Sequence, residues 1–323
     1  MALYLGDYRI ALDCADANSN VNFVSHAHSD HIAGLRKNRK MIASAITKEL
    51  VQARKNTELE LVEVPRNARL LNAGHMFGSR QLYIESQEHG CSVLYSGDYQ
   101  IQESYAAERI ETTETDVLII DSTYPFANVT FDDRMEVMES IRSYAKAKLE
   151  KGIVVFSSYS MGKAQELIRI FNEDGIVPAV DANIDRINQA YRRLGMELDY
   201  MVIDDTDQQD GRLMQNFVYV TSARKFRDEC IRISSTFRKR LFTAVATGFA
   251  KIMRFDVDVQ FALSDHADFR QAVEYISRCN PKTIYTVGSG AAAFSRSLTN
   301  FGYLAQPLCE ARELGNMMLN TTL

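Results

Sequence analysis

The stretch "VSHAHSDHIAGL", residues 24–35, holds three of the six histidines in the chain, together with an aspartate. Side chains alternate along an extended segment, so His26 and His28 project to the same side. A turn after His28 then lets Asp30 and His31 reach a second point nearby. Neutral imidazole and carboxylate are ligands that zinc accepts. We therefore expect this stretch to bind metal.

Three further candidate ligands lie next to short apolar runs typical of strands. His75 lies in the glycine-flanked loop "NAGHMFGS", Asp98 ends "SVLYSGD", and His266 follows "FALSD". Each alone is more typical of an ordinary loop residue. With the first motif, however, they bring the number of nitrogen and oxygen ligands to seven, which is enough for two metal ions. Only His89, in "QEHGC", is left without a role.

The composition is that of an ordinary soluble protein, with 323 residues, 46% hydrophobic and 24% charged. No apolar run approaches eighteen residues, and the first residues lack the pattern of a secretory signal, so we expect a cytoplasmic protein with no membrane span. Five scattered cysteines, none in a C-x-x-C pair, indicate reduced thiols and are poor candidate ligands. They are Cys14, Cys91, Cys230, Cys279 and Cys309.

Positive charge is concentrated in one segment of an acidic chain. Residues 221–254 carry nine Lys/Arg against two acids, so the rest of the chain is near −12 when the net charge is −5. A second cluster, "RKNRK" at 36–40, follows the histidine motif. Such clusters are often solvated helix faces. Their number, and the position of one beside the metal motif, favour binding to nucleic acid instead.

The order of the expected elements indicates an α/β protein. Up to about residue 124 the chain reads as short strands with one helix at 46–55. From about 125 strands and amphipathic helices alternate, as "IVVFSS" followed by "GKAQELIRIFNEDG" illustrates. This alternation is typical of a parallel sheet with crossover helices.

Motifs spread over nearly the whole chain resemble one group of enzymes. "HAHSDH", "AGHMFGS" and "YSGD" are similar to motifs of the metallo-β-lactamase-fold hydrolases. "DSTY", "SSYSMGKAQELI" and "LSDHADF" further resemble the β-CASP branch, whose members are nucleases that process nucleic acids. Within that branch the chain looks most like compact archaeal and bacterial proteins described as mRNA 3′-end processing factors or exonucleases.

The resemblance implies a metallo-β-lactamase αββα sandwich, formed by residues 1–125 and 249–323, with an α/β β-CASP cap inserted at 126–248. It implies two zinc ions, with manganese as an alternative. One ion would be bound by His26, His28 and His75, the other by Asp30, His31 and His266, and Asp98 would bridge them. The expected catalytic residues are Asp30, Asp98, Asp121 and His266.

Two further acidic residues match positions of the same family. Asp121 of "DSTY" corresponds to the acidic residue that supports the metal-binding histidines, and Asp13 of "ALDCAD" corresponds to an early aspartate. Neither position follows from the spacing of residues alone.

The resemblance also suggests where substrate binds. The serines of "SSYSMGK" are similar to a cap loop that contacts the substrate phosphate, although serines there could instead cap a helix. One position departs from the pattern, because many β-CASP nucleases carry "VHG" where this chain has "YTVGSG", which places Gly288 or Val287 at the histidine. Members that act on DNA tend to have valine there. The candidate substrate-binding residues are Ser157, Ser158, Ser160, Lys163, Arg224 and Gly288.

We therefore expect a zinc-dependent nuclease that cleaves phosphodiester bonds of single-stranded RNA or DNA with a metal-bound hydroxide. A homodimer is a candidate assembly. Two alternatives remain: a catalytically weak nucleic-acid-binding homologue in a processing complex, which the altered "VGSG" favours, and a small-molecule hydrolase of the same fold. The basic segment and the helices of the cap argue against the second alternative.

Overall fold

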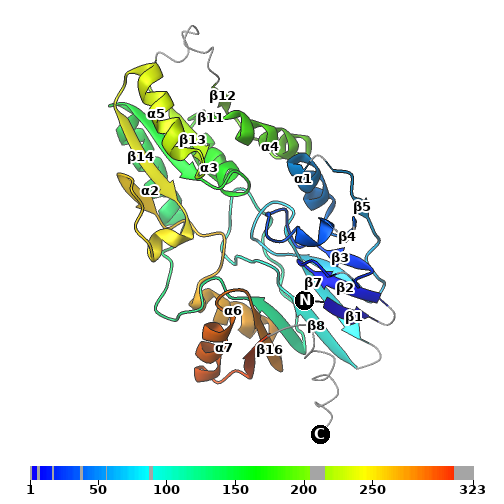
Figure 1. Ribbon diagram of the computed structural model, residues 1–323. Helices are drawn as coiled ribbons and strands as arrows, with labels where there is room; N and C mark the ends of the chain where they lie inside the picture. Colours follow the sequence, from blue (N-terminus) through cyan, green and yellow to red (C-terminus); the bar gives the residue numbers. More distant parts are fainter. Residues whose placement is uncertain are drawn as a thin grey trace. The chain divides into compact units, whose positions relative to one another are not determined.

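The computed structural model describes residues 2–5, 8–16, 18–36, 39–55, 57–86, 90–203 and 215–308 (Figure 1). The chain divides into two compact units. Unit 1 comprises the described parts of Met1–Glu103, Ala107–Thr130 and His266–Leu323, and unit 2 comprises Ser104–Ala106 and the described parts of Phe131–Asp265. Both contain sheets and helices, so the expected α/β class is confirmed.

Unit 1 contains two sheets. The first has five strands, in which β1 and β2 are antiparallel and the remaining neighbours are parallel, in the order β1 (Ala2–Leu5), β2 (Tyr8–Leu12), β3 (Val21–Phe23), β4 (Lys40–Ile42) and β5 (Glu60–Leu61). The second has six strands, in the order β17 (Ala305–Pro307), β16 (Thr283–Val287), β9 (Val117–Asp121), β8 (Cys91–Tyr95), β7 (Arg80–Ser86) and β6 (Ala68–Asn72). In it, β7 is antiparallel to both β6 and β8.

The core of unit 1 lies between and behind these sheets. Ile10 and Phe23 of the first sheet pack with Ile119 of the second in one buried cluster, which fills the space between the sheets. The opposite face of the second sheet is covered by α6 (Phe269–Cys279) and α7 (Ala291–Asn300), which bury their apolar side chains against it. The remaining helices of unit 1 are α1 (Ala45–Lys55) and the 3₁₀ turn η1 (Ala33–Arg36).

Unit 2 is built on a sheet of six parallel strands. Their order is β12 (Met201–Val202), β11 (Ala179–Val180), β13 (Val218–Ser222), β10 (Ile153–Ser158), β14 (Leu241–Ala246) and β15 (Val259–Phe261). Parallel strands require crossover connections. The connecting segments contain α2 (Arg134–Leu149), α3 (Lys163–Asn172), α4 (Ala182–Arg193), α5 (Phe226–Phe237) and the 3₁₀ turn η4 (Gly248–Lys251).

Alternation along β10 assigns α3 and α5 to opposite faces of this sheet. Val155 lies in the cluster against which Phe226 of α5 packs, whereas the ring of Phe156 contacts that of Phe171 of α3, with centroids 5.3 Å apart. The helix that follows β10, α3, therefore covers one face of the sheet, and the helix that follows the neighbouring β13, α5, covers the other face. Such a pair of strands is the topological switch point of a parallel sheet.

The extent of unit 2 differs from the expected 126–248. Residues 249–265 lie in unit 2 because β15 pairs in parallel with β14, as Val245 opposite Gln260 illustrates. Identification of unit 2 as a β-CASP cap stays a prediction.

Two expectations from composition can be compared with the structure. None of the helices among the described residues is long and apolar enough to cross a membrane. Cys14, Cys91, Cys230 and Cys279 form no disulfide with one another, whereas Cys309 lies outside the described residues, as does His89.

A buried ion cluster joins the two ends of unit 2. Arg134, the first residue of α2, pairs with Glu166 and Asp265 and donates to the carbonyl oxygen of Ser264. The Nζ of Lys163 lies 2.7 Å from Glu166 Oε2 and also pairs with Asp265. The side chains of Arg134, Lys163 and Glu166 are at most 4% exposed. Buried charges of this kind are tolerated only when each is paired.

We predict that Arg134→Ala lowers the free energy of unfolding of the protein by about 3–5 kcal/mol, because it leaves buried carboxylates without their partner. The matched control is Arg142→Ala on the same helix, whose partners Glu139 and Asp174 both remain accessible to solvent, so a much smaller change is expected. Urea unfolding of both variants measures the difference. Equal effects would contradict the importance of the buried cluster.

Candidate metal centre

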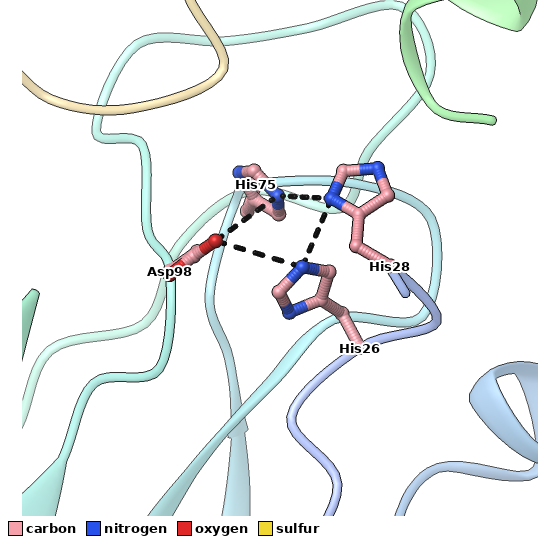
Figure 2. Close-up of side chains that lie close together, drawn as sticks. All are labelled: His26, His28, His75 and Asp98. Atoms are coloured by element: carbon pink, nitrogen blue, oxygen red, sulfur yellow. Dashed lines mark hydrogen bonds and ion pairs between the residues drawn. The ribbon is translucent and has the colours of Figure 1, made fainter. Parts of the chain in front are cut away.

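Three histidines and one aspartate of unit 1 bring four ligand atoms together (Figure 2). His28 Nδ1 lies 3.0 Å from His26 Nε2 and 3.2 Å from His75 Nε2. Asp98 Oδ2 lies 3.6 Å from the same atom of His26 and 3.8 Å from that of His75. Tetrahedral zinc with ligand distances of 2.0–2.1 Å places neighbouring ligand atoms about 3.3 Å apart. The four atoms therefore fit one ion.

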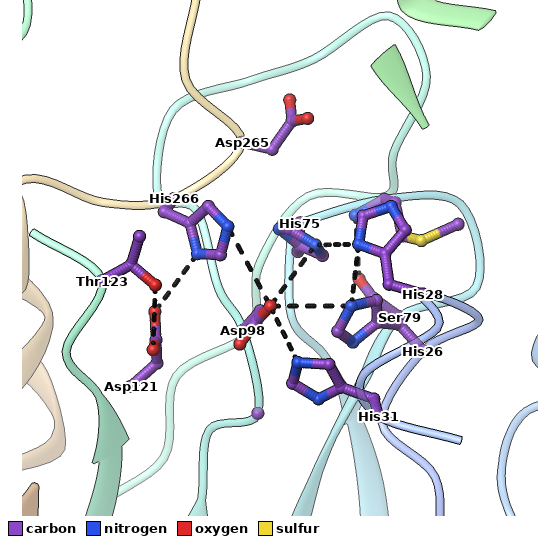
Figure 3. A network of polar contacts seen from close by, with 12 residues as sticks. His26, His28, His31, His75, Ser79, Asp98, Asp121, Thr123, Asp265 and His266 are labelled. Atoms are coloured by element: carbon purple, nitrogen blue, oxygen red, sulfur yellow. Dashed lines mark hydrogen bonds and ion pairs between the residues drawn. The ribbon is translucent and has the colours of Figure 1, made fainter. Parts of the chain in front are cut away.

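A second group of possible ligands surrounds the same oxygen of Asp98 (Figure 3). His31 Nε2 lies 3.2 Å and His266 Nε2 lies 4.0 Å from Asp98 Oδ2. Asp30, with a side chain 78% exposed, lies 3.6 Å from His31 Nε2. Asp98 is thus placed between the two groups, which is the position of a bridging ligand. Asp98, Asp121 and His266 also form a compact set of ligand atoms.

Both histidines of the second group are oriented by a carboxylate. His31 Nδ1 lies 2.9 Å from Asp13 Oδ2, and His266 Nδ1 lies 3.2 Å from Asp121 Oδ2. A carboxylate on one ring nitrogen fixes the tautomer and leaves the other nitrogen for a metal. The contact of Asp121 is consistent with the supporting role that the resemblance implied for it, whereas the resemblance implied no such role for Asp13. Both Nε2 atoms face Asp98.

Asp13 is the most connected of these acids. Its Oδ2 also accepts hydrogen bonds from Ser25 Oγ at 2.6 Å and from Tyr95 OH at 2.9 Å, and its Oδ1 accepts from the backbone N–H of Ser25 at 2.8 Å. Ser25 Oγ lies 2.9 Å from His26 Nδ1, so the same network orients a ligand of the first group. Sequence reasoning missed Ser25 and Tyr95, because a serine and a strand tyrosine carry no signal of such a role.

Backbone contacts hold the ligand loops against one another. Gly74, next to His75, has φ +74°, and a β-carbon there would lie 2.1 Å from the carbonyl oxygen of Gln100, so only glycine allows this approach. The Nε2 of Gln100 donates to the carbonyl oxygen of His266 at 2.9 Å. Asp268 and Gln271 then form a capping box that begins α6 immediately after His266. The loops of three ligands are thus fixed together.

Helix α1 supports two of the histidine loops. Ser44 Oγ and Thr47 Oγ1 donate to the carbonyl oxygen of Gly78 at 2.7 and 2.9 Å. At the other end of the helix, Arg54 Nη1 donates to the carbonyl oxygen of Ala27 at 3.3 Å. The helix predicted from sequence at 46–55 therefore positions the loops that carry His26, His28 and His75.

The electrostatics of the cluster favour the protonation states that bind metal at two residues, neutral His26 and ionised Asp98. Burial, together with neighbouring histidines, holds the pKa of His26 well below its ordinary value, so this imidazole is neutral. Burial opposes ionisation of Asp98, but His31 and His266 hold its pKa well below its ordinary value. Burial likewise lowers the pKa of His31, but Asp13 and Asp98 outweigh it and raise this pKa to about 12. A metal ion at His31 would replace that proton.

The candidate substrate-binding residues other than Gly288 all lie in unit 2. Ser157 and Ser158 are buried at the end of β10, and Ser160 is half-buried in the loop before α3. These serines do not cap α3, whose first turn is closed by Gln165 Oε1 accepting from the backbone N–H of Gly162 at 2.7 Å. Arg224 is exposed between β13 and α5.

Lys163 has a different environment from the one expected for a substrate contact. Only 1% of the residue is exposed, and its ammonium group is committed to Glu166 and Asp265. The sequence could not reveal this, because Asp265 comes from the far end of unit 2. We assign Lys163 to the buried ion cluster.

Gly288 lies beside the candidate metal centre. Val287 is opposite Asp121 in the register of β16 and β9, and a β-carbon on Gly288 would lie 3.5 Å from Asp121 Oδ1. Gly288 has φ +97°, which strains any other residue, so a histidine is disfavoured there. Val287 packs against the core between the sheets of unit 1. The backbone conformation at residue 288 therefore favours glycine over the histidine of "VHG".

Comparison with known proteins gives three informative matches, and no protein-family model matches the chain. A probable DNA ligase of Opitutus terrae is 26% identical over 91% of this chain and 29% of its own length. The mouse DNA cross-link repair 1A protein is 26% identical over 46% of this chain and 16% of its own length. An RNase J-like protein of Methanocaldococcus jannaschii is 27% identical over 51% of this chain and 49% of its own length.

The matches make this chain a homologue of metal-dependent hydrolases, and its cluster of histidines and aspartates could hold a metal ion. More particularly, the relatives include β-CASP nucleases, and the resemblance seen in the sequence motifs is confirmed. The chain spans at most about half the length of these three relatives.

We predict that Asp13→Asn weakens zinc binding roughly 10- to 100-fold, the usual cost of losing a residue that orients a metal ligand. Asparagine tolerates the left-handed backbone of Asp13 (φ 48°), so the fold should persist. Competition with a chelator measures affinity, and total zinc should approach two ions per wild-type chain. Asp16→Asn is the control, because Asp16 binds Arg9 and the backbone N–H of Asn18 instead. Equal affinity in both variants would refute the role of Asp13.

Proposed function

We propose that this chain is a zinc-dependent nuclease that hydrolyses phosphodiester bonds of single-stranded nucleic acid. The observation that supports it most is Asp98, whose Oδ2 faces His26 and His75 on one side and His31 and His266 on the other. Bound zinc would lower the pKa of a water molecule and neutralise charge that develops on the phosphate oxygens.

The residues of the chain have separate tasks in this reaction. Asp13 and Asp121 hold the rings of His31 and His266, and the hydroxyl of Thr123 donates to Asp121 Oδ1 at 3.1 Å and fixes that carboxylate in turn. Asp30 is the exposed acid of the group, so its carboxylate is placed to accept a proton from solvent. The buried Asp98 instead keeps a fixed negative charge between the two groups.

We favour DNA over RNA as the substrate. The match that covers 91% of the chain is named as a DNA ligase, and a second relative is named for DNA cross-link repair. Valine at the altered motif, Val287, supports the same choice through the resemblance to DNA-acting members. A hydrolase that trims strand ends would prepare the ends that a ligase joins. The RNase J-like relative keeps RNA as the alternative.

Catalytic weakness has less support than activity. Gly288 lacks a side chain that could contact phosphate, which motivated that alternative. However, the ligand residues are assembled, and both orienting carboxylates are present.

The decisive test is hydrolysis of end-labelled single-stranded DNA and RNA with and without a chelator. We predict chelator-sensitive cleavage, faster for DNA. Asp98→Asn should reduce the rate by more than the roughly 100-fold upper cost of losing a residue that only orients a ligand, because Asp98 would touch both ions. Asp116→Asn, on the same sheet but bonded to Ser92 and Lys282, should keep its activity. Cleavage that survives both chelator and Asp98→Asn would refute the proposal.

The basic segment is not one continuous surface. Arg224 and Lys225 are exposed just after β13, at the carboxyl edge of the parallel sheet of unit 2. Arg238 and Arg240 are exposed just before β14, at the opposite edge. Ligands of parallel α/β sheets bind at the carboxyl edge. We therefore assign backbone binding to the first pair.

We predict that charge reversal of Arg224 and Lys225 to glutamate reduces the salt dependence of single-strand binding by about 1.4 units of slope, or about 0.7 for each phosphate contact. Reversal of Arg238 and Arg240 is the matched control and should leave the slope unchanged. Binding measured at several salt concentrations tests this, and identical slopes for the two double variants would argue against our assignment.

A further inference from the structure

Unit 2 contains a pocket of about 690 Å³ at the carboxyl edge of its sheet. Its walls come from the ends of β10 and β14 and from the first turns of α5, with Val245, Phe226 and Phe249 among the apolar side chains. Pockets of this size, mostly apolar with a few polar groups, are typical small-molecule sites.

The position of the pocket follows from the topology of the sheet. Ser157 and Ser158 end β10, Ala223 follows β13, and all three line the pocket. These two strands form the switch point at which α3 and α5 depart over opposite faces. In open parallel sheets the crevice outside this point is the usual ligand site.

One polar side chain at the end of β10 faces this pocket. Side chains alternate along a strand, and Ser157 lies on the same face as Val155, which belongs to the cluster packed against α5. In the register of β10 and β14, Ser157 is opposite Val245, which also lines the pocket. Two other hydroxyls in the pocket have partners in the chain, since Thr243 Oγ1 donates to Asp258 at 2.8 Å and Thr247 Oγ1 accepts from the N–H of Phe249 at 3.3 Å.

The walls of the pocket are aromatic and its rim is charged, and this difference limits the kind of ligand that fits. Phe226, Phe249 and Phe255 offer aromatic surface, whereas Arg227 and Asp256 at the rim are exposed and carry opposite charges. Arg224 and Lys225 lie immediately before Phe226 in the sequence. An occupant should therefore be planar and largely apolar, should hydrogen-bond at its edge, and should carry its negative charge outside the pocket.

We propose that this pocket binds a nucleobase. The base would lie against the phenylalanines, as bases do on aromatic side chains of single-strand-binding proteins. Its edge would bond to Ser157 Oγ, and the attached phosphate would meet Arg224 and Lys225. The base comes either from a free nucleotide or from an unpaired residue of a strand. The inference rests on the proposed function only for the choice of a nucleobase as ligand.

The test is binding of deoxyadenosine to the protein, measured by calorimetry. This nucleoside has no phosphate, so it has no group for which the metal centre would compete. We expect Ser157→Ala to weaken binding roughly tenfold, the upper range for one neutral hydrogen bond. Ser222→Ala is the matched control, because Ser222 ends the neighbouring strand β13 but does not line the pocket. It should bind normally.

A second pair of variants tests the volume of the pocket. Ala223→Trp places a large ring at the exposed mouth and should abolish binding, whereas Ile231→Trp, on an exposed face of α5 outside the pocket, should not. The chain has no tryptophan of its own, so the introduced ring is the sole tryptophan reporter, and deoxyadenosine should leave the fluorescence of Ala223→Trp unchanged. Absent binding to wild-type protein, or unimpaired binding to Ala223→Trp, would overturn the proposal.

Two further arms identify the source of the base and separate this inference from the proposed reaction. Stronger binding of deoxyadenosine monophosphate than of a short oligodeoxyadenylate supports a free nucleotide, and the reverse order supports a strand. Asp98→Asn should bind deoxyadenosine as tightly as wild type, because Asp98 does not line the pocket. Nucleoside binding by a protein without nuclease activity would therefore uphold the pocket and refute only the reaction.

Discussion

The carboxylate of Asp13 is the interaction on which the metal centre depends. It receives two hydrogen bonds from Ser25, one from Tyr95 and a contact with His31, and so it joins loops of the first sheet to a strand of the second. Burial raises the pKa of Tyr95 well above its ordinary value, and Asp13 adds to this effect, so the phenol remains a donor. One acid thus fixes both a ligand and the spacing between the sheets at the site.

The ligands converge because of the strand directions in unit 1. β6 and β8 are both antiparallel to β7, and β8 is parallel to β9, so the three strands end at the same edge of the sheet. His75, Asp98 and Asp121 lie at or just after these ends. The loop after β3 brings the first histidine motif to the same place. Short loops between rigid strands leave little freedom to the ligand atoms, which is the condition for a preformed metal site.

The candidate ligand residues could be proposed from the sequence because each carries a local signal, either close spacing in "HAHSDH" or a polar residue at a strand end. The alternation of strands and helices could likewise be predicted from the sequence. Other features depend on partners remote in sequence. The pairing of Lys163 with Asp265, the inclusion of β15 in unit 2 and the division of the basic segment between two edges all follow from tertiary packing. The positive φ of Gly288 was likewise invisible.

The buried ion cluster of unit 2 also has a consequence for the order of folding. Arg134 contacts Ser264 and Asp265, so the cluster joins the beginning of unit 2 to its end. His266 and Asp121 of unit 1 are 145 positions apart, and most of the chain between them is unit 2. Closing so long a loop in an unfolded chain is entropically costly, whereas a folded insertion with joined ends shortens it. We therefore expect the candidate metal centre to form late, after the inserted unit has brought the two halves of unit 1 within reach.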